Sequence, residues 1–90
     1  MLEIKSDGII SMLILSSLSL GDKTIDSLCD EIKLEGVTKN DIYYNLYELS
    51  QLLCIEGVMR KNRRRKKYVA YKITPQGDQM LVDLKEKLRF

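Results

Sequence analysis

The feature that most constrains the fold is a short basic run between two segments with the composition of β-strands. Seven of the eight residues in the run Arg60–Lys67 are basic, and Asn62 alone is not. The preceding segment reads IEGVMRK. The following one reads KYVAYKIT, in which Val69, Tyr71 and Ile73 alternate with other side chains. Two such strands around a short polar stretch predict an antiparallel hairpin with a basic tip.

Four helical patterns surround this hairpin, three before it and one after it. Apolar residues recur at spacings of three and four, which is typical of helices with one buried face. The patterns predict helices over residues 6–20, 24–35, 39–53 and 76–89. Ser6 is expected to cap the first helix, Gly21 to end it, and Pro75 to begin the last one.

The third predicted helix has the best-marked start. Thr38 is placed to cap it, and Asp41 lies three residues later, as in a capping box. A helix, a short turn at Gly36 and a capped second helix make up a helix-turn-helix. With the hairpin, the order helix-helix-helix-hairpin-helix predicts a mainly α fold with a small β-hairpin. This is a winged helix-turn-helix, expected as one domain over residues 1–90.

Positive charge is concentrated at the predicted hairpin tip. The chain has 15 basic and 13 acidic residues. Without the seven basic residues of the run, eight remain against 13 acidic ones, a net charge of −5. An acidic body with one basic projection predicts a polyanionic partner, and the alternative is a solvated tip whose charge prevents aggregation. The first interpretation assigns phosphate or minor-groove contacts with double-stranded DNA to Arg60, Lys61, Arg63, Arg64, Arg65, Lys66 and Lys67.

The third predicted helix has an apolar and a neutral polar face. Its apolar side chains fall within about 60° of arc and are expected in the core: Ile42, Leu46, Leu49 and Leu53. The opposite face is rich in hydrogen-bonding groups, which base edges in a major groove require. We expect base contacts from Asn40, Tyr43, Tyr44 and Tyr47, with Lys39 near a phosphate. The alternative is that the tyrosines pack against the hairpin or the second helix.

The composition excludes several classes of chemistry. The chain has no histidine, which removes Ser-His and Cys-His nucleophilic systems and histidine metal sites. It has no glycine-rich phosphate loop. Cys29 and Cys54 lie 25 positions apart, without metal-ligand spacing, and are expected to pack as small apolar residues. A disulfide or redox role stays open at this stage. We therefore predict no enzyme activity, no metal and no cofactor.

The apolar stretch Ile9–Leu20 is too short to span a bilayer and contains four serines. Acidic Glu3 and Asp7 before it argue against a signal peptide. We expect a cytoplasmic protein with no membrane partner. It would be associated with the nucleoid, or lie in the host cytoplasm if the protein is viral.

The last predicted helix, residues 76–90, carries a short apolar seam. Its leucines and glycine repeat at spacings of four, three and four, as in a coiled coil. The predicted homodimer interface consists of Gly77, Met80, Leu81, Leu84 and Leu88, with Gly77 allowing close approach. The first helix has more apolar positions than one buried face needs, so a spare face is expected to receive the partner's helix. The alternative is that the last helix folds back onto its own domain.

Two segments resemble the PadR-like transcriptional regulators of the winged-helix superfamily. DIYYNLYELSQLLCIEG is similar to the recognition helix of that family, and RRRKKYVAYKITPQGDQML to its wing and exit. The family's exit reads Tyr-x-Leu-Thr-x-x-Gly, a pattern matched here by Tyr71, Ile73, Thr74 and Gly77. The resemblance covers about residues 9–85. It departs at Tyr44 and Leu53, where the family has proline and glycine. Small winged-helix proteins of archaeal viruses and plasmids look similar too.

The sequence thus predicts a sequence-specific DNA-binding protein, a transcriptional repressor that binds a palindromic site as a homodimer. Two other functions fit the same fold. One is an adaptor for plasmid or viral DNA segregation or packaging, and the other is a winged helix that contacts protein or RNA. The operator, the regulated gene and any small-molecule effector are not encoded in a readable pattern.

Overall fold

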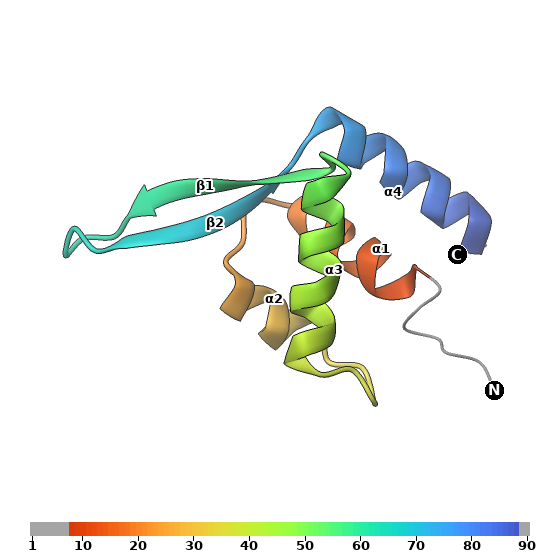
Figure 1. Cartoon of the computed structure of the whole chain (residues 1–90), viewed down its shortest axis with the longest axis horizontal. Helices are drawn as coiled ribbons and strands as arrows, with labels where there is room; N and C mark the ends of the chain where they lie inside the picture. Colours follow the sequence, from red (N-terminus) through yellow and green to blue (C-terminus); the bar gives the residue numbers. More distant parts are fainter. Residues whose placement is uncertain (1–7, 89–90) are drawn as a thin grey trace.

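The computed structural model describes residues 8–88 (Figure 1). Three helices come first: α1 (Ile9–Leu18), α2 (Ile25–Glu31) and α3 (Lys39–Gln51). A hairpin and a last helix follow: β1 (Ile55–Lys61), β2 (Lys67–Ile73) and α4 (Pro75–Leu88). The element order and the mainly α winged helix-turn-helix fold are confirmed. We call the hairpin β1–β2 the wing, since it projects well beyond the helices (Figure 1).

Helix α1 forms the centre of the hydrophobic core. Ile10, Ile14 and Leu15 are fully buried, because α1 packs against α3, α4 and β2. The wide apolar surface read from the sequence therefore serves several neighbours within the chain. The spare face predicted for a partner chain is correspondingly smaller. No helix within residues 8–88 is both long and apolar enough to cross a membrane.

The first two helices are shorter than the sequence predicts. Helix α1 begins at Ile9 after Gly8, whose φ of 87° is left-handed; the predicted cap Ser6 lies outside the described residues. Helix α1 ends at Leu18, and Leu20 is 85% exposed. Helix α2 ends at Glu31 instead of Glu35. Ile32 leaves the helical conformation and remains buried in the core, so tertiary packing overrides local propensity there.

Helix α3 begins as predicted and ends earlier than predicted. The Thr38 hydroxyl accepts from Asp41 N at 3.2 Å, and Thr38 N donates to the Asp41 carboxylate at 2.8 Å, which completes a capping box. Helix α3 ends at Gln51. Leu53 then takes a left-handed φ of 60° and is 67% exposed, so its predicted place in the core is wrong. Cys54 is buried in its stead, with Cys54 N donating to Leu49 O at 2.9 Å.

The two cysteines pack as the sequence predicts. Cys54 is buried in the core, and Cys29 is half-buried and packs against it. Both are free thiols, and burial raises the pKa of each above its ordinary value. A thiol with a raised pKa is a weak nucleophile at neutral pH, in keeping with a packing role.

The wing is joined to the body by its base. Strands β1 and β2 are antiparallel, with a register from Ile55 opposite Ile73 to Lys61 opposite Lys67. At the base, Tyr71 N donates to Lys23 O at 2.7 Å and Lys23 N donates to Tyr71 O at 3.1 Å. The connection between α1 and α2 therefore adds one bridge to the outer edge of β2.

Thr74 and Gly77 join the wing to α4. The Thr74 hydroxyl donates to Leu53 O at 2.7 Å and accepts from Gly77 N at 3.1 Å. A side chain at Gly77 would overlap the carbonyl oxygen of Cys54. The close approach that Gly77 permits is thus made within the chain, which corrects its predicted role at a dimer seam.

Helix α4 packs on its own domain through residues that the sequence assigned to a dimer interface. Leu81 is buried in the core, while Met80 and Leu84 are half-buried against it. Within the single chain, this part of α4 therefore packs on its own domain, and the dimer interface stays a prediction. The fifth predicted interface residue, Leu88, ends α4, and its side chain lies outside the described residues.

Candidate nucleic-acid interface

Asn62 shapes the tip of the wing, residues 62–66. Its side-chain oxygen accepts from the backbone N–H groups of Arg64 at 2.9 Å and Lys66 at 3.0 Å. In the backbone, Asn62 N donates to Lys66 O, and Asn62 O accepts from Arg65 N. Asparagine side chains stabilise turns in this way because they substitute for a backbone carbonyl. The one residue of the basic run that is not basic thus folds the tip, a role that sequence reasoning missed.

The basic residues of the wing fall into two groups. Arg60 forms an ion pair with Asp22, at the connection between α1 and α2. The other six make no ion pair with any residue from 8 to 88: Lys61, Arg63, Arg64, Arg65, Lys66 and Lys67. The Lys72 ammonium, on β2, lies 3.8 Å from the Glu56 carboxylate across the strands. The unpaired charge is therefore at the projecting end, and Arg60 holds the wing to the body.

Arg65 lies in the left-handed region, with a φ of 62°. Residues other than glycine and asparagine take this conformation at a cost of about 1 kcal/mol. Gly or Asn would fit the tip better on conformational grounds, yet the position carries a cation. An unfavourable backbone conformation at an exposed basic residue points to a role outside the chain.

The outer face of α3 exposes the predicted base-contacting side chains. Tyr44 and Tyr47 are 63% and 60% exposed, and Tyr43 is 46% exposed. Asn40 and Lys39, at the start of the helix, are also exposed. The Lys39 ammonium lies 3.6 Å from the Asp26 carboxylate and 6.0 Å from the Tyr43 ring centroid. The tyrosines are thus left uncovered by the wing and α2.

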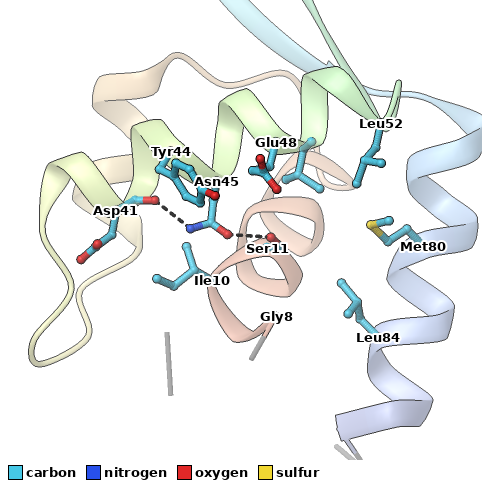
Figure 2. Close-up of a pocket in the computed structure, with 11 residues that line it drawn as sticks. Gly8, Ile10, Ser11, Asp41, Tyr44, Asn45, Glu48, Leu52, Met80 and Leu84 are labelled. Carbon is cyan, nitrogen blue, oxygen red and sulfur yellow. Dashed lines mark hydrogen bonds between the residues drawn. The ribbon is translucent and has the colours of Figure 1, made fainter. Parts of the chain in front are cut away.

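The charge on α3 differs between its two edges. Asp41 and Glu48 line a groove of about 490 Å³ between α1, α3 and α4, together with Tyr44 (Figure 2). The wing and α4 lie on opposite sides of α3 (Figure 1). Phosphates would be repelled at the acidic edge, which is the edge away from the wing. A duplex on α3 is therefore favoured on the side shared with the wing.

Asn45 fixes α3 against α1. Its amide nitrogen donates to Asp41 O at 2.8 Å, and its oxygen accepts from the Ser11 hydroxyl at 2.7 Å (Figure 2). Asn45 belongs to α3 but is turned inward, so it positions this helix against α1. Sequence reasoning could not identify this pairing, because Ser11 lies 34 positions away.

Glu31 connects three elements behind the interface. Its carboxylate accepts from the Lys23 ammonium at 2.7 Å and from the Ser17 hydroxyl at 2.6 Å. These two hydrogen bonds, Lys23 first, hold the pKa of the Glu31 carboxyl below its ordinary value. Lys23 also bridges to Tyr71 through its backbone, so the network ties α1 and α2 to the wing. Within residues 8–88, no three Cys, Asp or Glu side chains gather as a metal ion would require.

Comparison with known proteins identifies the fold. No family model matches the sequence, and no curated protein matches it. Solved structures do match. A PadR family transcription regulator from Clostridium difficile R20291 has a TM-score of 0.79 at 21% identity, covering 92% of this chain and 90% of that one. A PadR-like transcriptional regulator from Bacillus cereus has a TM-score of 0.77 at 24% identity, covering 89% and 81%.

A third neighbour was solved with a nucleic acid. Bacillus subtilis PadR in complex with operator DNA has a TM-score of 0.71 at 20% identity, covering 83% of this chain and 45% of that one. These likenesses confirm the fold that the PadR-like resemblance implied. Each neighbour shares the arrangement of helices and wing at low sequence identity.

Proposed function

We propose that this chain is a double-stranded DNA-binding transcription regulator, a repressor that binds a palindromic site as a homodimer. One observation carries the proposal. Six basic side chains at the projecting end of the wing have no ion-pair partner within residues 8–88, while Arg60, nearer the body, is paired. Charge left unpaired on a projection favours a polyanion that supplies many phosphates.

Helix α3 supports a duplex as that polyanion. Its exposed face combines Asn40 with three tyrosines, of which Tyr44 lies toward the acidic edge formed by Asp41 and Glu48. Such groups suit base edges in a major groove, where hydrogen bonds and apolar contacts read sequence. The proposal therefore divides the work: the wing supplies affinity and α3 supplies sequence preference. The structural neighbour bound to operator DNA adds support, since it has the same fold. Regulation of this kind requires no enzyme activity and takes place in the cytoplasm.

The homodimer part of the proposal rests on the side formed by α1 and α4. Met80 and Leu84 line the groove and are only half-buried in the single chain. A partner helix there would cover their remaining apolar surface, and a two-fold dimer would present two α3 helices to two half-sites. Leu84→Glu should then give a folded monomer with much weaker binding to a palindromic site. Sedimentation equilibrium would measure the mass of both proteins.

Selection of bound duplexes from a random pool at moderate salt tests the function and the symmetry together. A palindromic consensus is the expected result. The selected duplex should then be compared with an RNA duplex and a scrambled DNA duplex in the same buffer. Equal binding to all three would contradict a regulator with its own operator. A non-palindromic consensus bound by a monomer would contradict the homodimer alone.

A further inference from the structure

One face of the distal wing carries an exposed apolar pair among its charges. Met59 lies opposite Val69, and they are 61% and 42% exposed. Opposed residues and those two positions along share a face of a hairpin, so the next pair on this face is Lys61 with Lys67. Figure 1 shows that this part of the wing extends beyond all the helices.

The other face of the distal wing is accounted for within the chain. There Arg60 lies opposite Tyr68 and pairs with Asp22, and Ala70 is 4% exposed. Charged side chains alone would keep the hairpin tip from aggregating, so this role does not explain an exposed methionine. Val69 lies next to Gly57 within the chain, yet the Met59–Val69 pair remains exposed, on the face that also presents two unpaired lysines.

The positive charge around the Met59–Val69 pair indicates what kind of partner surface would cover it. Six unpaired cations adjoin it, and they favour a polyanion over a protein groove. On duplex DNA, the minor groove is about 6 Å wide and runs between two lines of phosphate, and proteins that bind there frequently insert apolar side chains. The strands of a hairpin are about 4.8 Å apart, and Lys61 lies about 7 Å along from Met59. Apolar side chains can thus reach into the groove while the lysines reach its phosphate rims.

We infer that Met59 and Val69 form an apolar contact with the minor groove of A·T-rich DNA, beside the site read by α3. This inference rests on the proposed function and adds to it a second element of sequence preference. Guanine projects a 2-amino group into the minor groove, whereas A·T pairs do not. An apolar pair that approaches the groove floor would be blocked by that group. Apolar wedges at minor-groove steps are a general device of DNA-binding proteins.

The test uses near-isosteric polar substitutions and modified bases. Met59→Gln combined with Val69→Thr keeps size and removes apolar character; Val82→Thr, at a 51% exposed valine on α4, is the matched control. In the selected duplex, each A·T pair is replaced in turn by G·C and by inosine·C. Inosine lacks the 2-amino group but shows the major groove the same acceptors as guanine.

The expected result separates the two grooves. At the pairs under the wing, the wild-type protein and the Val82→Thr control should bind A·T and inosine·C alike and G·C about five- to tenfold more weakly. The double variant should lose this preference and keep the salt dependence of the wild type, because no cation has been removed. Thermal unfolding followed by circular dichroism should show all three proteins equally folded.

Four outcomes would overturn the inference. If the double variant binds and distinguishes A·T from G·C like wild type, the apolar contact is contradicted and the proposed function is unaffected. If the wild-type protein binds G·C and inosine·C equally at every position, the minor-groove assignment is contradicted. Wild-type self-association that the double variant loses, with DNA binding unchanged, would make the pair a protein contact. If the wild-type chain binds no duplex at all, the proposed function fails, and the inference fails with it.

Discussion

The two ends of the wing are built in opposite ways. At the base, Tyr71 and Lys23 exchange backbone hydrogen bonds, Ile55 is buried, and Gly77 lies against the Cys54 carbonyl. At the tip, the hydrogen bonds of Asn62 hold the loop, and the six cations in and next to this loop have no ion-pair partner within residues 8–88. The base therefore contributes to stability, while the charge at the tip is left without a counter-charge within residues 8–88. Each end should fail in its own way when mutated.

Removing charge from the tip should have the largest effect. Arg63, Arg64 and Arg65 changed together to alanine should weaken binding to every duplex about a hundredfold at about 0.1 M salt, since each phosphate contact releases counterions. The log–log slope of affinity against salt should fall by about three. Fluorescence anisotropy across a salt series measures both, and thermal unfolding should be unchanged. A triple variant that binds like wild type at every salt concentration would show that the tip is not an interface.

Crowding the base should instead unfold the protein. Gly77→Ala places a methyl group on the Cys54 carbonyl and against Ile73, which should lower the free energy of unfolding by about 3 kcal/mol. Gly57→Ala is the control, because its new methyl would meet only the tips of the Val69 and Tyr71 side chains, so its cost should stay below about 1 kcal/mol. Urea unfolding compares the two. Equal stability of both variants would contradict the close packing of Gly77 against the Cys54 carbonyl.

Helix α3 should respond differently from either end of the wing. Asn40→Ala or Tyr44→Ala should weaken the preferred site by about 1–3 kcal/mol if a base contact is lost. Binding to unrelated duplexes and the salt slope should not change, because neither residue is charged. Tyr44→Phe separates the hydroxyl from the ring. Uniform weakening on all duplexes would assign these residues to backbone contacts.

A single residue at the tip should separate stability from binding. Arg65→Gly relieves the left-handed backbone conformation and should raise the free energy of unfolding by up to about 1 kcal/mol. It should also lower the salt slope of DNA binding by about one. Arg64→Gly removes the same charge from a residue without a positive φ, so it should lower the slope without stabilising. Identical stability of the two variants would contradict the strain at Arg65.

The smallest expected effect lies behind the base, at Glu31. Its folded-state pKa is lowered by Lys23 and Ser17, so its contribution to stability is present above the ordinary carboxyl pKa of about 4.3 and is lost as pH falls through the folded pKa. Glu31→Gln should be less stable than wild type near pH 7 and lose less stability on acidification. Thermal unfolding at several pH values tests this. Parallel pH curves for the two proteins would contradict it.

The sequence predicted the order of elements because local signals agree with it. Thr38 and Asp41 mark the start of α3, and strand alternation marks β2. Its errors came where distant residues decide. Leu53 follows the apolar pattern of α3 but lies beyond the helix end in a left-handed conformation. Helix periodicity cannot show that α3 ends before Leu53, nor that Cys54 is buried in the core position instead.

The candidate interface was predictable by residue type more than by role. The basic run and the exposed face of α3 were identified, and the structure leaves both exposed. The roles of Asn62, Arg60 and Asn45 were not, because each depends on a partner that folding brings close. Gly77 shows the same limit: its place in a heptad-like repeat suggested a partner helix, and the carbonyl it meets belongs to its own chain.

The double hydrogen bond of Thr74 has a mechanical consequence. One hydroxyl joins the Leu53 carbonyl after α3 to the first turn of α4, and so helps to set the angle between α3 and α4. In the proposed homodimer, α4 would connect the two α3 helices. A small tilt of α4 at Thr74 would then change the separation of the two α3 helices. Half-sites on a duplex recur at intervals of about 34 Å, so the length of operator that this protein accepts would be tuned at a residue that touches no DNA.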